Sequence, residues 1–176
     1  MVLDPTLHWT ARLTLALLFG AAAFHKLSDL AAFRQALARY ELTPAATAYR
    51  LAPLLAGCEL ALAVSLLPGW RPAAASLMAV ALLALYSAAI GINLARGRRD
   101  FDCGCGPQDT PLSEGLLIRN LLLMIGAAAL SLPLRERTLS WLDGVTIAAA
   151  VTAAVLLYAA AETIRHNDSL AGSTPR

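Results

Sequence analysis

The sequence predicts an all-α membrane protein, a bundle of about five transmembrane helices. Three observations support this fold class: the composition, the length of the apolar segments and the positions of the tryptophans. Of the 176 residues, 58% are hydrophobic and 15% are charged, whereas a typical soluble domain has about 45–50% and about 25%. The formal net charge of +2 is too small to indicate a nucleic-acid partner, so the expected surroundings are a lipid bilayer.

Five apolar segments approach the roughly 20 residues that a helix needs to cross the hydrocarbon core of a bilayer. They cover residues 9–27, 50–67, 72–94, 114–132 and 144–164. No Lys or Arg precedes Arg12, so the first segment lacks the charged start of a signal peptide and is expected to be retained. We therefore predict one transmembrane domain over residues 1–165 and a mobile polar tail over 166–176.

A short amphipathic helix is predicted between the first two segments. Leu30, Phe33, Leu37 and Tyr40 recur at spacings of three and four residues, which places them on one face of a helix. The Ser-Asp pair before them can cap its amino terminus. We expect this helix to lie in the membrane interface; a soluble connector is the alternative.

Five spans put the two ends of the chain on opposite sides of the membrane. We call side A the end of the bundle with the N-terminus and the loops after the second and fourth segments, and side B the opposite end. Tryptophan favours membrane interfaces, and Trp9, Trp70 and Trp141 all fall at side A in this arrangement. Most Lys and Arg residues fall at side B, so the positive-inside rule places side B in the cytoplasm.

Polar side chains that are costly in lipid gather toward side B, and such residues are candidates for function. They are His25, Lys26, Glu59, Asn93, Arg119 and Asn120. We expect Glu59 and Arg119 to form an ion pair, because each charge is costly alone. Structural roles are the alternatives. Lys26 can extend its charge to the interface, the asparagines can join helices by hydrogen bonds, and His25 can be an ordinary residue of a helix end.

A Cys-Gly-Cys sequence follows the third segment. Cys103 and Cys105 can form a disulfide if the chain bends at Gly104, a residue type that tolerates positive φ. Because so tight a ring is expected to be strained and readily reduced, a thiol–disulfide redox pair is the favoured interpretation. A soft-metal site that recruits His25 or Cys58 and a loop without chemistry are the alternatives. Cys58 itself is expected to be a small buried apolar residue.

These motifs resemble those of the MauE family, methylamine utilisation membrane proteins grouped with DoxX-like redox-associated membrane proteins. The likeness covers the first four segments. It lies in Phe24-His25-Lys26, Tyr40 with Leu42 and Pro44, Glu59, the run from Asn93 to Arg98, the run from Asp102 to Gly106, Leu112-Ser113 and Arg119-Asn120. The stretch from Asn93 to Gly106 is the most specific part. The resemblance implies a DoxX-like four-helix core plus a fifth, C-terminal helix.

The resemblance also implies a function in maturing the β-subunit of methylamine dehydrogenase, a periplasmic subunit rich in disulfides that carries a tryptophan tryptophylquinone cofactor. It implies a thioredoxin-like partner of the MauD type. In such an exchange one thiolate attacks and the other resolves, cationic side chains favour the thiolate, and His25 or Glu59 moves protons. The expected site residues are Cys103, Cys105, His25, Lys26, Glu59, Arg119 and Asn120.

No cofactor is expected beyond the redox-active Cys103–Cys105 pair, although a quinone can take part in such chemistry. A soft-metal binding or transport protein and a non-catalytic scaffold for the partner are the alternative functions. The expected location is the bacterial inner membrane, with several spans. A periplasmic client favours the cysteine loop outside, whereas the charge count favours it inside, so the side remains open.

Overall fold

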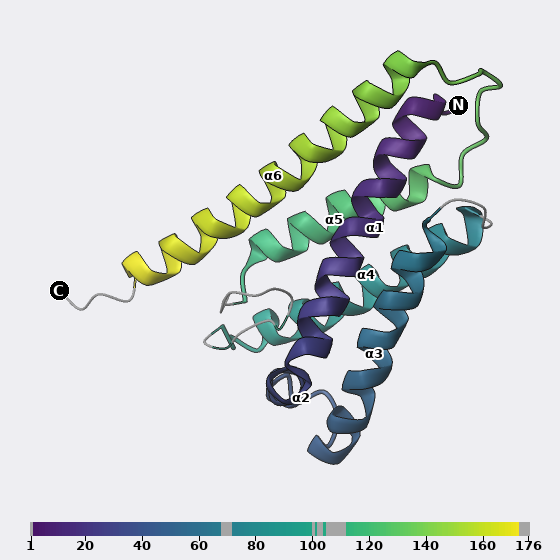
Figure 1. Cartoon of the computed structure of the whole chain (residues 1–176). Helices are drawn as coiled ribbons and strands as arrows, with labels where there is room; N and C mark the ends of the chain where they lie inside the picture. The colour runs from purple at the N-terminus through teal and green to yellow at the C-terminus, as the bar shows by residue number, and fades with distance from the viewer. Residues whose placement is uncertain (1, 68–71, 100, 102–103, 105–111, 173–176) are drawn as a thin grey trace.

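The chain forms a bundle of helices, and the computed structural model describes residues 2–67, 72–99, 101, 104 and 112–172. The helices are α1 (Pro5–Ser28), α2 (Leu30–Arg39), α3 (Ala45–Ser65), α4 (Pro72–Ala95), α5 (Glu114–Ala129) and α6 (Trp141–Gly172). Figure 1 shows α1 crossing the bundle between α3 and α6, with α5 and α4 behind it. Across the described residues, extended pairing is limited to an isolated bridge between Leu3 and Leu134. The predicted all-α class is confirmed.

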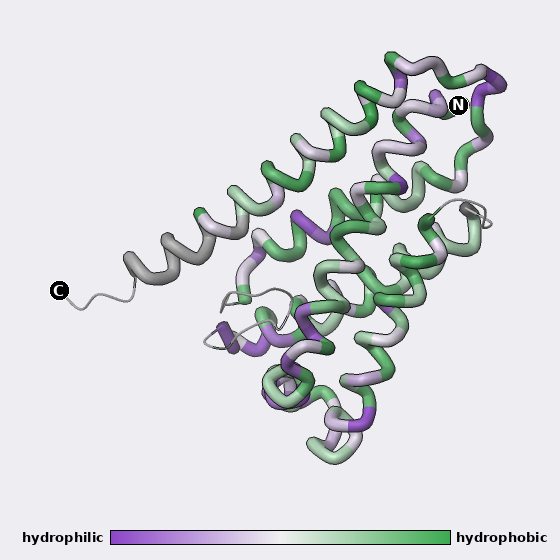
Figure 2. Tube along the Cα trace, in the orientation of Figure 1, coloured by the Kyte–Doolittle hydropathy of each residue, from purple (hydrophilic) through white to green (hydrophobic). Residues whose placement is uncertain are grey.

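Among the described residues, four helices are long and apolar enough to cross a membrane: Pro5–Ser28, Ala45–Ser65, Ala73–Ala95 and Trp141–Ala161. Figure 2 shows hydrophobic residues along most of their lengths. The remaining predicted span differs. Helix α5 has 16 residues, or about 24 Å at the usual rise per residue, less than the roughly 30 Å hydrocarbon core. The protein is therefore a multi-pass membrane protein in which α5, the fourth predicted span, falls short of the length of a crossing helix.

The two C-terminal spans end at different places from those predicted. Beyond Ala129, the amides of residues 130–132 donate to carbonyls three residues earlier, so α5 tightens before Pro133, which cannot continue the ladder. Helix α6 instead continues to Gly172 and has 32 residues. The expected polar tail is thus helical as far as Gly172; its mobility stays a prediction.

Among the described residues, the N-terminus, the end of α3 and the segment after α5 lie at the same end of the bundle, as predicted for side A. Leu3 bridges to Leu134 in the segment after α5. The Arg12 guanidinium, buried in α1, donates from Nε to the Leu66 carbonyl at 2.6 Å, which ties the end of α3 to the same region. Trp9 and Trp141 lie in the first turns of α1 and α6 at this side, and Trp70 lies outside the described residues.

Small residues set the contact between α1 and α3. Ala23 of α1 and Ala56 of α3 are fully buried, and a Cβ added to Gly20 would lie 3.7 Å from the Cβ of Ala63. Membrane helices approach closely where such small residues meet. This close approach brings the side B end of α1 against the middle of α3.

Helix α2 lies across the side B end of α1, where Figure 1 shows it almost along its axis. The Asp29 carboxylate caps it, accepting a hydrogen bond from the Ala32 amide at 2.9 Å, as predicted. Phe33 and Tyr40 are buried on the predicted apolar face. The amphipathic helix is confirmed, and its position in a membrane interface stays a prediction.

Candidate functional site

A buried ion pair joins α1 to α3. Lys26 falls on the same buried stripe of α1 as Phe19 and Ala23, so its side chain points into the bundle rather than out to the interface. Its Nζ forms a salt bridge with Oε1 of Glu59, and the two side chains are 3% and 1% exposed. Breaking such a pair from one side leaves an uncompensated buried charge. The snorkelling alternative for Lys26 is wrong.

Tyr86 of α4 completes this cluster. Its hydroxyl donates to Glu59 Oε1 at 2.7 Å, and its ring lies 4.7 Å from Lys26 Nζ. The same oxygen of Glu59 thus accepts from both the lysine and the tyrosine. The second oxygen, Oε2, is buried and has no hydrogen-bond partner within the described part of the chain.

A second polar group comes from α5. Arg119 donates from Nε and Nη2 to Oδ1 of its neighbour Asn120, at 3.2 and 3.1 Å. It also donates to the Tyr158 hydroxyl of α6 at 3.2 Å. Asn120 in turn donates to Ser87 Oγ of α4 at 3.2 Å. This group therefore joins α4, α5 and α6, which agrees with the alternative that the asparagine joins helices.

A small cavity of about 50 Å³ separates the two polar groups. Its polar lining is Lys26, Glu59, Tyr86, Arg119, Asn120 and Tyr158, and its apolar lining includes Leu15, Phe19 and Leu83. Helices α1, α3, α4, α5 and α6 all contribute residues. Residues far apart in the sequence thus meet around one buried space.

The C-terminal end of α4 contacts the end of α2. Gly97 has a φ of +72°, and the amide of Arg98 donates to the Asn93 carbonyl at 3.0 Å, which is the pattern of a helix end closed by a left-handed residue. The buried Asn93 amide group donates to the Tyr40 carbonyl at 3.2 Å. Arg98 donates to Glu41 Oε1 at 2.9 Å. The motif from Asn93 to Arg98 therefore fastens α4 to the end of α2.

The next described residues of the loop also contact α2. The ring of Phe101 packs edge-on against Tyr40, with centroids 5.2 Å apart. Gly104 is buried with a φ of +66°, and a Cβ at this position would lie 3.1 Å from Ala36 Cβ and 3.4 Å from Phe33 Cδ2. A side chain here would be strained by both the backbone and the contact. Gly104 thus adopts the positive φ that its residue type tolerates.

Phe33 connects the loop to the buried ion pair. One edge of its ring faces the Gly104 position, and its centroid lies 5.1 Å from Lys26 Nζ. A single aromatic ring of α2 therefore separates the glycine of the Cys-Gly-Cys sequence from the Lys26–Glu59 pair. Cys103 and Cys105 flank this glycine and lie outside the described residues.

Two expectations about single residues are wrong. Glu59 pairs with Lys26 of α1 rather than with Arg119, because Lys26 points inward beside it while Arg119 turns to Asn120 and Tyr158. Cys58 is exposed rather than buried, since it lies beside Glu59 in the helix and so falls on a different face of α3.

The structure brings Lys26, Glu59, Arg119 and Asn120 together around the cavity, and among the described site residues His25 is the exception. His25 is half-buried in the last turns of α1, and it lines no part of the cavity. No hydrogen bond of its side chain appears within the part of the chain that the structure describes, which fits the alternative of an ordinary helix-end residue.

The sequence reasoning missed Tyr86, Tyr158 and Phe33. The two tyrosines carried a usable signal, because each is a hydroxyl within an otherwise apolar span and a buried tyrosine hydroxyl usually has a partner. Phe33 was placed on the apolar face of its helix, but nothing in the local pattern indicated that its ring would contact both a lysine and the cysteine loop.

Comparison with known proteins agrees with the motifs. The family model described as methylamine utilisation protein MauE matches residues 4–133. The methylamine utilization protein MauE of Paracoccus denitrificans is 34% identical over 163 residues, which cover 91% of this chain and 88% of that protein. The protein of the same name from Methylophilus methylotrophus is 36% identical, over 87% of this chain and 80% of that protein.

A third relative of that name, from Methylorubrum extorquens, is 35% identical over 85% of this chain and 76% of its own length. No solved structure matches the chain. The family model spans α1 to α5, and therefore includes the buried pair, the cavity wall of α5 and the cysteine loop. On this evidence the chain belongs to the MauE family.

Proposed function

We propose that this protein acts in methylamine utilisation by supporting thiol–disulfide exchange during maturation of the methylamine dehydrogenase β-subunit. Membership of the MauE family and the names of the relatives support the pathway. A thioredoxin-like protein is the proposed partner, and Cys103 and Cys105 are the proposed exchanging residues. The expected setting is the bacterial inner membrane.

The observation that carries this proposal is the docking of Gly104 on α2. The glycine between the two cysteines is buried, adopts a conformation that favours glycine, and contacts Phe33 and Ala36. We propose that this contact of Gly104 presents the two cysteines to a partner at the side B end of the bundle. Exchange reactions depend on access and alignment of the attacking sulfur, so a fixed loop suits them.

The proposed exchange has two steps. A thiolate of one cysteine attacks a disulfide sulfur of the client, so that a mixed disulfide forms and the other client sulfur leaves as a thiolate. The second cysteine then attacks the mixed disulfide, which forms the Cys103–Cys105 bond and releases the second client thiol. The client gains two electrons and the cysteine pair loses two. The thioredoxin-like partner restores the pair by the same steps, and both run in reverse when the client is to be oxidised.

The buried charges have a positioning function in this proposal. Lys26 is committed to Glu59 and contacts Phe33, so it acts on the loop through the ring on which Gly104 rests. Arg119 and Asn120 hold the opposite wall of the cavity. We propose that these residues keep α1, α2 and α5 in the arrangement that the loop needs.

Serine substitutions test the exchange directly. Cys103→Ser and Cys105→Ser should each abolish maturation of the client subunit while leaving the bundle folded, and the variant that keeps the attacking cysteine should trap a mixed disulfide. Alkylation with a mass-tagged reagent should label both thiols after reduction and neither after oxidation. A membrane-impermeant form of the reagent also reports which side carries the loop.

Cys58→Ser is the matched control, because Cys58 lies exposed on α3 and should be dispensable. Full client maturation by the Cys103→Ser/Cys105→Ser variant would contradict the exchange and favour a scaffold for the partner. Metal bound stoichiometrically to the purified protein, and lost in the same variant, would favour a soft-metal carrier.

A further inference from the structure

The cavity between the two polar groups has an unusual wall. Glu59 is 1% exposed, and its Oε1 already accepts from Lys26 and Tyr86. Its Oε2 is buried and has no hydrogen-bond partner within the described residues. Glu59 also lines the cavity, so the side chain that carries this unpartnered oxygen borders that space.

An ionised carboxylate cannot leave one oxygen unpaired in an apolar interior at low cost. Its charge is shared over both oxygens, and each can accept up to two hydrogen bonds. Burial without such partners is strongly unfavourable. Lys26 and Tyr86 donate hydrogen bonds to Oε1 only. Oε2 therefore needs a donor, and the cavity can supply the space for one.

The size of the cavity restricts that donor. A water molecule needs about 10–15 Å³ of such space and two or more polar partners, and the cavity measures about 50 Å³. The polar groups across the space belong to Arg119, Asn120 and Tyr158. One or a few water molecules fit this volume and chemistry.

We propose that this cavity is an internal hydration site, in which water donates a hydrogen bond to Glu59 Oε2 and bridges it to the polar wall of α5 and α6. The bound water completes the hydrogen bonds that Glu59 can accept within the bundle. The site requires nothing of the cysteine loop and is independent of the proposed exchange.

Radiolytic footprinting of the full chain in lipid nanodiscs tests the site, because X-rays convert bound water into hydroxyl radicals that oxidise adjacent side chains. Two leucines make the comparison. Leu15 is 3% exposed and lines the cavity, whereas Leu62 is 0% exposed and packs in the apolar core cluster. Leu15 should be oxidised several-fold faster than Leu62. Equal rates would overturn the hydration site.

Displacement of the water provides a second measurement. Ala22→Leu adds a larger side chain to the cavity lining and should lower oxidation of Leu15 to the rate of Leu62. Ala21→Leu, an exposed position next to it on α1, is the matched control and should change nothing. Replacing the pair together, as Lys26→Met/Glu59→Leu, should also abolish the fast oxidation. Persistence of the fast rate in that variant would show that Glu59 does not hold the water.

Discussion

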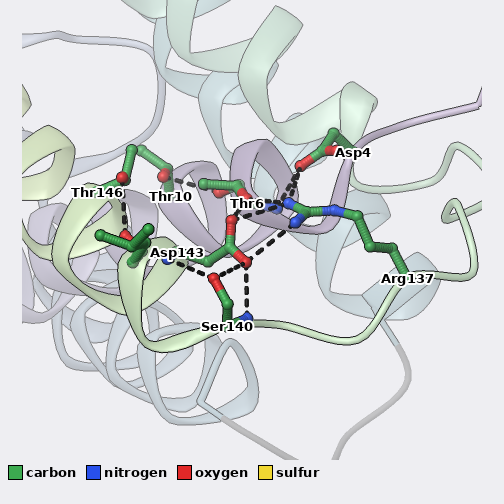
Figure 3. A network of polar contacts seen from close by, with 8 residues as sticks. Asp4, Thr6, Thr10, Arg137, Ser140, Asp143 and Thr146 are labelled. Carbon is green, nitrogen blue, oxygen red and sulfur yellow. Dashed lines mark hydrogen bonds and ion pairs between the residues drawn. The ribbon is translucent and has the colours of Figure 1, made fainter.

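The two ends of this bundle hold their ion pairs in opposite ways. At side B, the Lys26–Glu59 pair is almost completely buried, at 3% and 1% exposure. At side A, Arg137 forms ion pairs with Asp4 and Asp143 near the surface, where the arginine side chain is 39% exposed. Figure 3 shows this second network, in which Ser140 and Thr6 also take part. Both join distant segments, but only one does so inside the hydrophobic interior.

The difference shows that the polar contacts at the two ends depend in different ways on their surroundings. Water can replace any lost partner at side A, so the network of Arg137 fastens the N-terminus to the start of α6 at small cost if it is broken. At side B the surrounding medium cannot replace a partner, so each polar group depends on the others. A costly arrangement of this kind, next to the cysteine loop, is a candidate for function by its position.

The largest effect should come from breaking the buried pair. Glu59→Leu or Lys26→Met should each destabilise the bundle by about 3–5 kcal/mol, because each leaves an uncompensated buried charge. The Lys26→Met/Glu59→Leu variant should recover most of that stability. Denaturant unfolding in mixed micelles measures all three.

A matched control for the pair is Arg119→Met, which leaves Lys26 and Glu59 together. If Glu59→Leu were rescued by Arg119→Met rather than by Lys26→Met, the pairing described here would be incorrect. If the doubly apolar variant folded but failed to mature the client, the pair would be required for function as well as for folding.

A smaller effect is expected at the glycine of the cysteine loop. Gly104→Ala should cost about 1–2 kcal/mol for its left-handed backbone, and more because its Cβ would lie 3.1 Å from that of Ala36. Hydrogen exchange of the α2 amides and the alkylation rate of the loop thiols should both rise.

Alanine substitutions at two other glycines distinguish the cost of backbone strain from the cost of the close Cβ contact. Gly97→Ala meets the same backbone strain, with a φ of +72°, but no atom within 4 Å, and Gly91→Ala meets neither. The expected order of destabilisation is therefore Gly104, Gly97, Gly91. Ala36→Gly should partly rescue Gly104→Ala, and an unaltered thiol reactivity in Gly104→Ala would argue against a docked loop.

The smallest effect should come from the exposed network. Arg137→Met should lower the free energy of unfolding by only a small fraction of the change expected for the buried pair. Added salt should remove the loss caused by Arg137→Met. Thermal unfolding at low and high ionic strength measures it. A salt-independent loss as large as that of Glu59→Leu would show that the two ends are not different in kind.

The same network predicts that the stability of the fold depends weakly on pH. The Thr6 amide, together with its hydroxyl and Arg137, holds the pKa of Asp4 below its ordinary value of 3.8. A carboxyl with a lowered folded-state pKa stabilises the fold above its unfolded pKa and loses that contribution as the pH falls through the folded value. Asp4→Asn should therefore reduce stability at neutral pH and leave it unchanged in strong acid, as unfolding across pH can measure.

Much of the fold followed from local patterns. The apolar segments located the long helices, the spacing of Phe33 and Tyr40 located α2, and the Ser-Asp pair located its cap. These features depend on neighbours within a few residues, which a sequence displays directly. The shortened α5 depended on Pro133 and the tight turn before it, and apolarity alone did not reveal that end.

The candidate site was predicted only in part. Composition identified Lys26, Glu59 and Arg119 as costly residues in lipid, because that cost depends on residue type and depth alone. Which charge would pair with which depended on the side to which each helix turns, and the expected partner of Glu59 was wrong. The wrong expectation for Cys58 has the same origin, since the rotation of α3 leaves this residue exposed.

The sequence by itself determined that this chain is helical, that it spans a membrane and that polar groups gather toward one end, because apolar length and residue type set those properties. Only the tertiary structure decided that Lys26 meets Glu59, that Tyr86 and Tyr158 border the same cavity and that Phe33 lies between the pair and Gly104. These contacts join residues from different helices, and their distances depend on the rotation and close approach of whole helices, which small residues such as Ala56 permit.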